Sequence, residues 1–419
     1  MSLIVYAIPI FFLLIGVELL IGKMKRLSYY RYHDAITNLS CGIGSQVSGL
    51  FLKALTVVAY IKLYEISPFR EKIPNTWWVW ILLFFGVDFF YYWFHRLAHE
   101  ISIMWGSHVV HHQSEDYNLT VALRQAWYQG AFSFVFYLPL AAAGFRPEMF
   151  FVISQIVTLY QFWIHTRLID KMHPAIEFFF NTPSHHRVHH GVNPKYIDRN
   201  HAGTFIIWDR MFGTFQAEEE EVVYGITKQP KSWNPLWVNF EYWVDLFRDV
   251  FRAGTVKNAL LMLFKMPGWK PKELGGTEEY KEVTPKTFRK YETEISPGLN
   301  HYVLVQFILV LLGTTAFLLF QASEPLSGNW WLKFSAATLI VFSLVSFGGM
   351  FERKTWTPQL EIVRLILLVI VSVFLFQDSY FFITAVVVVA VIAVASLIWF
   401  SRFVKEILSS NAGNLLKTA

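Results

Sequence analysis

Long apolar runs separated by short polar segments dominate this chain. A transmembrane helix needs about 20 predominantly apolar residues to cross the ~30 Å hydrocarbon core of a bilayer. By this pattern we expect about nine membrane-spanning helices and an all-α, polytopic integral membrane protein. The predicted spans are residues 3–22, 40–64, 77–97, 127–144, 149–168, 302–320, 330–347, 361–376 and 380–400.

Basic residues set the expected orientation. The first predicted span is followed by Lys23, Lys25, Arg26 and Arg31, and positive charge is retained on the cytoplasmic side of a membrane. The amino terminus is therefore expected outside. The third predicted span then runs inward and ends on the cytoplasmic side, where the polar segments that follow it also lie.

Composition agrees with a membrane protein and excludes several classes. The chain is 54% hydrophobic and only 16% charged, whereas soluble domains carry roughly 25% charged residues. The single cysteine, Cys41, excludes a disulfide framework and a cysteine-based metal site. The formal net charge of +5 is ordinary for basic loops, so no nucleic-acid partner is expected. The first run lacks a preceding basic region and a cleavage site, so we expect a retained span.

Four regions are expected along the chain. Residues 1–76 form amino-terminal spans, and residues 77–235 hold the polar and histidine-rich segments. Residues 236–300 form an interfacial region that begins with an amphipathic helix. Residues 301–419 form a carboxy-terminal membrane region of four helices, whose spans contain no histidine and few polar groups. An acidic run at residues 218–221 is expected to be a solvated loop.

The histidines gather in two places. Nine of the fourteen lie within residues 95–112 and 185–190. Their spacings of three and four place them on one face of a short helix, with Cβ atoms about 5–6 Å apart. The sequence thus predicts three imidazole forks. They are His95 with His99, His108 with His111 and His112, and His186 with His189 and His190.

These forks predict a metal site. Imidazole suits iron, zinc, copper and nickel, and so many histidines exceed the needs of one tetrahedral zinc, so two metals fit the count. Purely structural histidines are the alternative, but burying so many without metal would leave many polar nitrogens to satisfy. His165, at the end of a predicted span, is a further candidate ligand. His185 is a candidate ligand or a hydrogen-bond donor behind the ligands. His173, which precedes a proline, is a weaker candidate ligand, and His33, His201 and His301 are expected to be ordinary polar residues.

Carboxylates near the forks are candidates for supporting or catalytic roles, because metal-bound histidines usually donate their other N–H to a carboxylate or carbonyl. Glu100 directly follows His99, and Asp88 lies inside a predicted span, where an ionisable residue is a functional-site hypothesis. These two are our candidate catalytic residues. Further partners are expected among Asp116, Asp198 and Asp209.

The pattern HxxxH, HxxHH, HxxHH on a polytopic chain resembles the fatty acid hydroxylase/sterol desaturase superfamily of integral-membrane, non-haem di-iron enzymes. Within it, residues 115–125, 161–166, 181–191 and 206–215 are similar to the alkylglycerol monooxygenase (glyceryl-ether monooxygenase) family. The resemblance identifies residues 77–235 as a di-iron catalytic domain. The expected metal ligands are His95, His99, His108, His111, His112, His165, His185, His186, His189 and His190.

The resemblance also implies the chemistry. Two iron ions and molecular oxygen would hydroxylate the ether-bearing carbon of an alkylglycerol lipid drawn from the bilayer, and the hemiacetal would collapse to a fatty aldehyde and glycerol. An electron donor is needed, and the animal enzymes use a tetrahydropterin. A sterol or fatty acyl hydroxylase or desaturase of the same superfamily is the alternative. A transition-metal transporter would instead place polar residues at mid-span.

Overall fold

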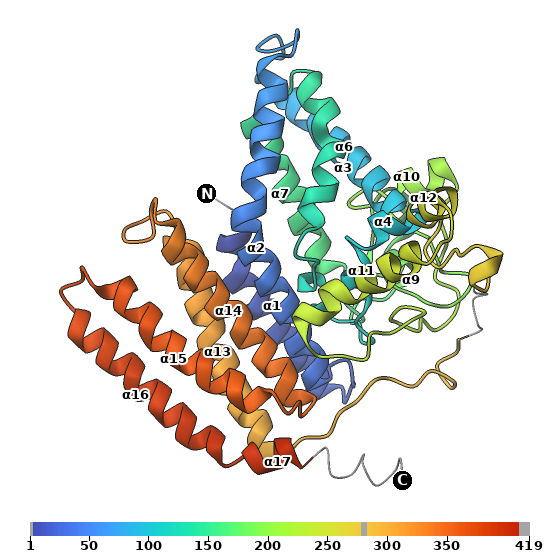
Figure 1. Ribbon diagram of the computed structural model, residues 1–419. Helices are drawn as coiled ribbons and strands as arrows, with labels where there is room; N and C mark the ends of the chain where they lie inside the picture. The colour runs from blue at the N-terminus through green and yellow to red at the C-terminus, as the bar shows by residue number, and fades with distance from the viewer. Residues whose placement is uncertain (1–2, 278–282, 410–419) are drawn as a thin grey trace. The chain divides into compact units, whose positions relative to one another are not determined.

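The computed structural model describes residues 3–277 and 283–409 (Figure 1). Helices are the regular structure of these ranges, apart from one isolated bridge between Gly191 and Tyr224. The all-α prediction is therefore confirmed. The chain divides into two compact units. One comprises Met1–Pro230 with Asn239–Lys290, and the other comprises Lys231–Val238 with Tyr291–Ala419.

Long helices form the frame of the first unit. Helices α1 (Leu3–Met24), α2 (Tyr32–Glu65), α3 (Trp77–Glu100), α6 (Gln129–Ala142) and α7 (Pro147–Trp163) pack side by side, with α3 against both α6 and α7. The helices between and after them are mostly short. They are α4 (Ser102–Trp105), α5 (Val109–His112), η1 (Val121–Leu123), α8 (Pro174–Phe179), α9 (Pro183–His189), α10 (Ile207–Phe212), α11 (Pro235–Phe251), α12 (Val256–Phe264) and η2 (Lys272–Leu274).

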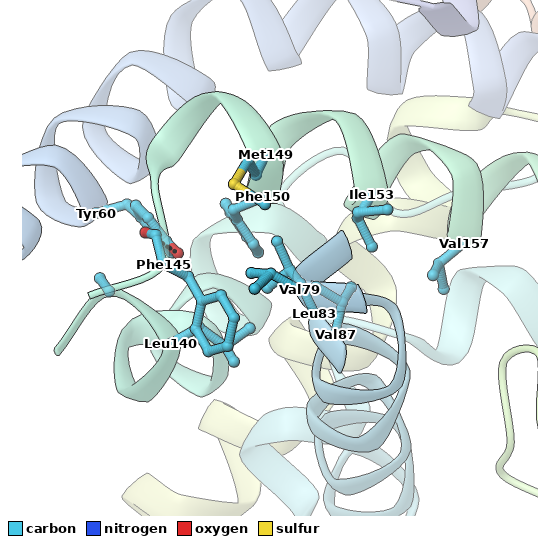
Figure 2. Packing of buried hydrophobic residues seen from close by; sticks show 11 residues of the cluster. Tyr60, Val79, Leu83, Val87, Leu140, Phe145, Met149, Phe150, Ile153 and Val157 are labelled. Atoms are coloured by element: carbon cyan, nitrogen blue, oxygen red, sulfur yellow. Dashed lines mark hydrogen bonds between the residues drawn. The ribbon is translucent and has the colours of Figure 1, made fainter. Parts of the chain in front are cut away.

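A buried apolar cluster fixes the amino-terminal half of α3. Figure 2 shows Val79 and Leu83 of this helix packed among side chains from α2, α6 and α7. The Tyr60 ring stacks on Phe150 with centroids 4.3 Å apart. Apolar side chains gain little by leaving lipid for protein, so close packing holds such helices together. This packing sets the position of the carboxy-terminal end of α3, which carries two predicted ligands.

The second unit is a bundle of membrane helices. Helices α13 (Pro297–Phe320), α14 (Trp330–Phe351), α15 (Thr357–Phe376) and α16 (Phe382–Ser401) pack each against the next in chain order, and α13 also contacts α16. The short α17 (Val404–Leu408) packs on α15. Each of the four helices α13 to α16 is long and apolar enough to cross a membrane.

A buried polar network lies inside this bundle. Glu361 accepts hydrogen bonds from Arg364 and Ser346, at 2.8 Å each, and from the Tyr302 hydroxyl. Arg364 also donates to the Gln306 side chain at 2.8 Å. Charged groups within membrane segments are paired with one another when they face a bundle interior. The network joins α13, α14 and α15, so these polar residues have a structural role.

Fewer helices are long enough to cross a membrane than the sequence predicts. Among the described residues, α1, α3, α13, α14, α15 and α16 meet the length and apolarity needed, and α2, bent by 42°, would be a seventh. The other two of the nine predicted spans are α6 and α7, of 14 and 17 residues. These runs included loop residues at their ends, His165 among them, and hydropathy alone does not separate loop from helix.

Replacing Arg364 with methionine should destabilise the second unit. The change leaves the Glu361 carboxylate buried without its counter-charge, which costs about 3–5 kcal/mol in comparable buried pairs. We expect a lower unfolding temperature of detergent-solubilised protein and partial recovery in the double variant E361Q/R364M. An R364M protein as stable as the wild type would contradict a structural role for the pair.

Candidate metal centre

Nine buried histidines form two adjoining sets. We call His95, His99, His108, His112 and His189 the first histidine group, and within it the potential ligand atoms lie within 4.8 Å of one another. The second histidine group meets the same criterion and comprises His111, His165, His186 and His190. Each group brings together residues from distant parts of the sequence.

Adjacent histidines separate into different groups. Consecutive residues on a helix point about 100° apart, so the two members of a His-His pair face different directions. His111 lies in the second group and His112 in the first, while His189 lies in the first and His190 in the second. Each HxxHH motif therefore contributes histidines to both groups, and the two groups must lie next to each other.

The inward nitrogens of each group converge. In the first group, His108 Nε2 lies 2.8 Å from His95 Nε2 and 3.1 Å from His112 Nε2. In the second, His165 Nε2 lies 3.2 Å from His111 Nε2 and 3.0 Å from His186 Nε2. This convergence is the arrangement expected of several imidazoles aimed at one point.

The outward nitrogens of four of these rings donate to backbone carbonyls. A carbonyl only accepts, so the proton lies on Nδ1 and the lone pair of Nε2 faces the group. This is the usual tautomer of a metal-binding histidine, oriented by a carbonyl behind it. The pairs are His95 with His201 (2.7 Å), His111 with Arg124 (2.8 Å), His165 with Gln161 (2.7 Å) and His189 with Arg199 (3.0 Å).

Several buried nitrogens have no hydrogen-bond partner among the described residues. They include Nε2 of His99, His189 and His190. A buried polar atom without a partner is costly and rare in folded proteins. Metal ions would satisfy these lone pairs, and an all-imidazole donor set suits a transition metal. The residues present therefore fit two metal ions, one in each group.

Burial keeps these rings neutral. Desolvation lowers the pKa of His108 to about 4 and that of His165 to about 3. The pKa values of His112 and His190 are lowered well below the ordinary value, by burial and then by neighbouring histidines. Only a neutral imidazole offers a lone pair to a metal, so the rings are in the ligating form at neutral pH.

Three of the predicted site residues, His185, Glu100 and Asp88, lie outside both groups. The buried His185 ring packs edge-on against Phe215 with centroids 5.5 Å apart. Glu100 is half-buried at the end of α3 and pairs with Arg96 at 2.8 Å. Neither side chain belongs to the convergent sets described above.

Two of the buried aspartates, Asp88 and Asp209, hold a loop. Asp88 accepts from the backbone N–H groups of Thr204 (2.7 Å) and Phe205 (3.0 Å) and from the Trp208 indole (3.0 Å). Asp209 accepts from the backbone N–H groups of His201 and Ala202, at 2.8 Å each. Together they fix residues 201–205, where the His201 carbonyl accepts the hydrogen bond from His95 Nδ1. Of the other two carboxylates predicted to support the site, one lies beside a histidine and one does not. Asp198 lies 3.4 Å from His99 Nδ1, whereas Asp116 forms an ion pair with Arg31.

An ion pair that sequence reasoning missed supports the second histidine group. Arg187, beside His186, makes a bidentate pair with Glu218 at 2.8 and 2.7 Å. It also donates to the carbonyls of Thr166 and Ile169, just after His165. The acidic run is thus more than a solvated loop, because Glu218 neutralises a buried cation between two elements of the site.

A carboxylate of the first helix contacts the segment that follows His165. Glu18 of α1 is buried and accepts from Leu119 N at 2.9 Å and from Thr166 Oγ1 at 2.5 Å. The Tyr30 hydroxyl donates to the same carboxylate. The signal in the sequence was an acidic residue within an apolar span, but its partners are distant in the chain.

The fold and the two groups define a class, namely integral membrane proteins whose buried imidazoles are arranged to hold metal ions. The sequence model of the family described as fatty acid hydroxylase matches residues 80–214. This range contains all nine convergent histidines. No solved structure matches the chain significantly.

Named relatives then give the family. The alkylglycerol monooxygenase of Xenopus tropicalis is 39% identical over 89% of this chain and 81% of its own length. Those of Danio rerio and Homo sapiens are each 38% identical, over 96% and 85% of this chain and 89% and 80% of their own lengths. The chain belongs to the alkylglycerol monooxygenase family, which confirms the predicted resemblance, and it is an oxidative, lipid-modifying enzyme.

Replacing Glu218 with glutamine should weaken the second histidine group. The buried Arg187 would lose its counter-charge, and the segment after His165 would lose its anchor. We expect a several-fold faster loss of metal to a chelator and a lower unfolding temperature. The matched control is Glu219→Gln, whose exposed pair with Lys195 is worth about 0–1 kcal/mol. Equal behaviour of the two variants would contradict the assignment.

Acid should destabilise the metal-free protein. Burial holds the pKa values of His108 and His165 at about 4 and 3, below the value of about 6.5 in an unfolded chain. As the pH falls below about 6.5, the unfolded chain binds protons that the folded chain does not, so stability decreases toward about pH 4. Thermal unfolding of chelator-treated protein across this range tests this, and a constant unfolding temperature would contradict it.

Proposed function

We propose that this protein is a di-iron monooxygenase that cleaves the ether bond of alkylglycerol-type lipids. The observation that carries the proposal is the pair of adjoining, buried histidine groups in a chain 38–39% identical to relatives named alkylglycerol monooxygenase. The proposed ligands are the nine histidines of these groups. The catalytic domain is proposed to be residues 77–235, which contain the family match.

The overall reaction balances with an external reductant. One oxygen atom of O2 enters the C–H bond of the ether-bearing carbon, and the other leaves as water with two electrons and two protons from the donor. The hemiacetal then breaks its carbon–glycerol oxygen bond to give a fatty aldehyde and free glycerol. A tetrahydropterin or another two-electron donor fills this role, and we assign no residue to its binding.

The protein's own groups position and shield this chemistry. When bound, iron supplies the activation of dioxygen that side chains cannot provide. The nine rings are all buried, which excludes bulk water from the reacting centre. Asp88 holds the loop whose His201 carbonyl accepts from His95, and the His185 ring packs against Phe215. Glu100 follows a ligand at the half-buried end of α3, and we propose it as the acid–base group at the rim.

The metal centre is proposed to face the cytoplasm. The basic residues Lys23, Lys25 and Arg26 follow α1 and favour an inside location for that loop. Helices α6 and α7 run in opposite directions and begin and end on the same side of the membrane. The orientation of the later helices is therefore the same whether or not α6 and α7 cross the membrane completely. On this basis we retain nine helices that enter the membrane, of which α6 and α7 are the short ones.

A sterol or fatty acyl hydroxylase or desaturase is the alternative within the superfamily. It is less favoured, because the relatives that cover most of this chain share the alkylglycerol monooxygenase name. A metal transporter is also disfavoured, because the histidines lie at helix ends and in loops instead of mid-span.

Protein purified in mild detergent from iron-supplemented cells should contain about two iron ions per chain. With O2 and a tetrahydropterin it should release a fatty aldehyde from a 1-O-alkylglycerol. His111→Ala and His189→Ala, one from each group, should each abolish the activity and reduce the iron content. His301→Ala, an exposed residue of α13, is the control and should change neither. Full activity in the His189 variant would contradict the site, and an inert alkylglycerol would contradict the substrate.

A further inference from the structure

Three buried rings meet at one edge of the first histidine group. The centroids of His99 and His189 are 4.8 Å apart, and the His201 centroid lies 5.1 Å from the first and 5.7 Å from the second. Each ring has one buried nitrogen without a partner in the described part of the chain: Nε2 of His99, Nε2 of His189 and Nδ1 of His201. His201 has 0% of its surface exposed.

One loop fixes the tautomers of these rings. His189 Nδ1 donates to the Arg199 carbonyl at 3.0 Å, and His201 Nε2 donates to the Asp198 carbonyl at 3.1 Å. Because carbonyls only accept, the unpartnered nitrogen of each of these two rings carries a lone pair. His99 has the same arrangement, with its Nδ1 3.4 Å from the Asp198 carboxylate.

His201 is a neighbour of the first histidine group and not a member of it. The group's donor atoms lie within 4.8 Å of one another, and no His201 nitrogen is in that set. Two nitrogens bound to one metal at about 2.0–2.1 Å are at most about 4.2 Å apart. This placement suits a residue that reaches the metal through one intervening molecule.

We propose that His201 Nδ1 accepts a hydrogen bond from a water molecule bound by the metal of the first histidine group. This inference rests on the metal assignment in the proposed function and deepens it. Because His201 Nδ1 can only accept a hydrogen bond, it favours a metal-bound molecule that has a hydrogen to donate, such as water. It disfavours a metal-bound anion that has no hydrogen to donate. His201 thereby selects which small molecule occupies the position beside His99 and His189.

The loop that carries His201 is held firmly enough for this role. The backbone N–H of His201 donates to the Asp209 carboxylate at 2.8 Å, and the His201 carbonyl accepts a hydrogen bond from His95 Nδ1 at 2.7 Å. The flanking residues Asp198 and Asn200 both adopt left-handed backbone conformations, with φ of 55°. Asp and Asn are the non-glycine residues that most readily adopt this conformation, so the turn before His201 suits its own sequence.

The test compares azide binding to cobalt-loaded wild type, H201F and the exposed control H301F. Cobalt content is measured first, and azide is then titrated while the Co(II) electronic absorption is followed. We expect two cobalt ions per chain in all three proteins and about tenfold tighter azide binding in H201F, as one unfavourable contact is removed. His201→Gln keeps both a donor and an acceptor and should restore the wild-type affinity. His201→Met is a second apolar variant in case the phenyl ring prevents folding.

Each outcome is decisive. Equal azide affinity in the wild type and the apolar variant would overturn the inference, because Nδ1 would then not face the bound molecule. Loss of a cobalt ion from the folded apolar variant would also overturn it, because His201 would then be a ligand. A folded wild-type protein that binds no cobalt would overturn the proposed function itself, and the inference with it.

Discussion

The site depends on keeping nine imidazoles buried and neutral, and on directing ring lone pairs inward, for which four of the rings have carbonyl partners. Burial alone favours the neutral form, since desolvation penalises the charged ring. It does not decide which nitrogen carries the proton. Backbone carbonyls do so for four rings, and the carbonyls come from segments as distant as Gln161 and His201. The loops around the site therefore orient the histidine groups as much as the helices that carry the histidines.

The parts of this centre that depend on local spacing could be predicted from the sequence. Spacing at i, i+4 predicted the pairs that stay together, which are His95 with His99, His108 with His112 and His186 with His190. The expectation that all three histidines of each HxxHH motif point one way was wrong, because the adjacent histidines of each motif face different groups. His185 differs from its neighbours, because its ring packs on Phe215 instead of joining a group. Spacing gave no reason to separate His185 from His186, since which side of a short helix faces the other segments depends on tertiary packing.

The remaining parts depend on contacts between residues far apart in the chain. Glu18 reaches Thr166, and Glu218 reaches Arg187, and no local pattern connects either pair. His201 was expected to be an ordinary polar residue, because it lies alone in the sequence and not at helical spacing from another histidine. Folding places its ring 5.1 Å from that of His99, so its isolation in the chain does not reflect its surroundings in space.

The position of the histidines along their helices fits the proposed chemistry better than a hydroxylation deep in an acyl chain. His95 and His99 lie in the last turns of α3, and His165 follows the end of α7. The ends of membrane helices lie where the hydrocarbon core meets the polar layer. The ether-bearing carbon of an alkylglycerol lies next to the glycerol group, at this same boundary. A lipid can therefore keep its alkyl tail in the apolar layer while the carbon to be oxidised meets the buried rings.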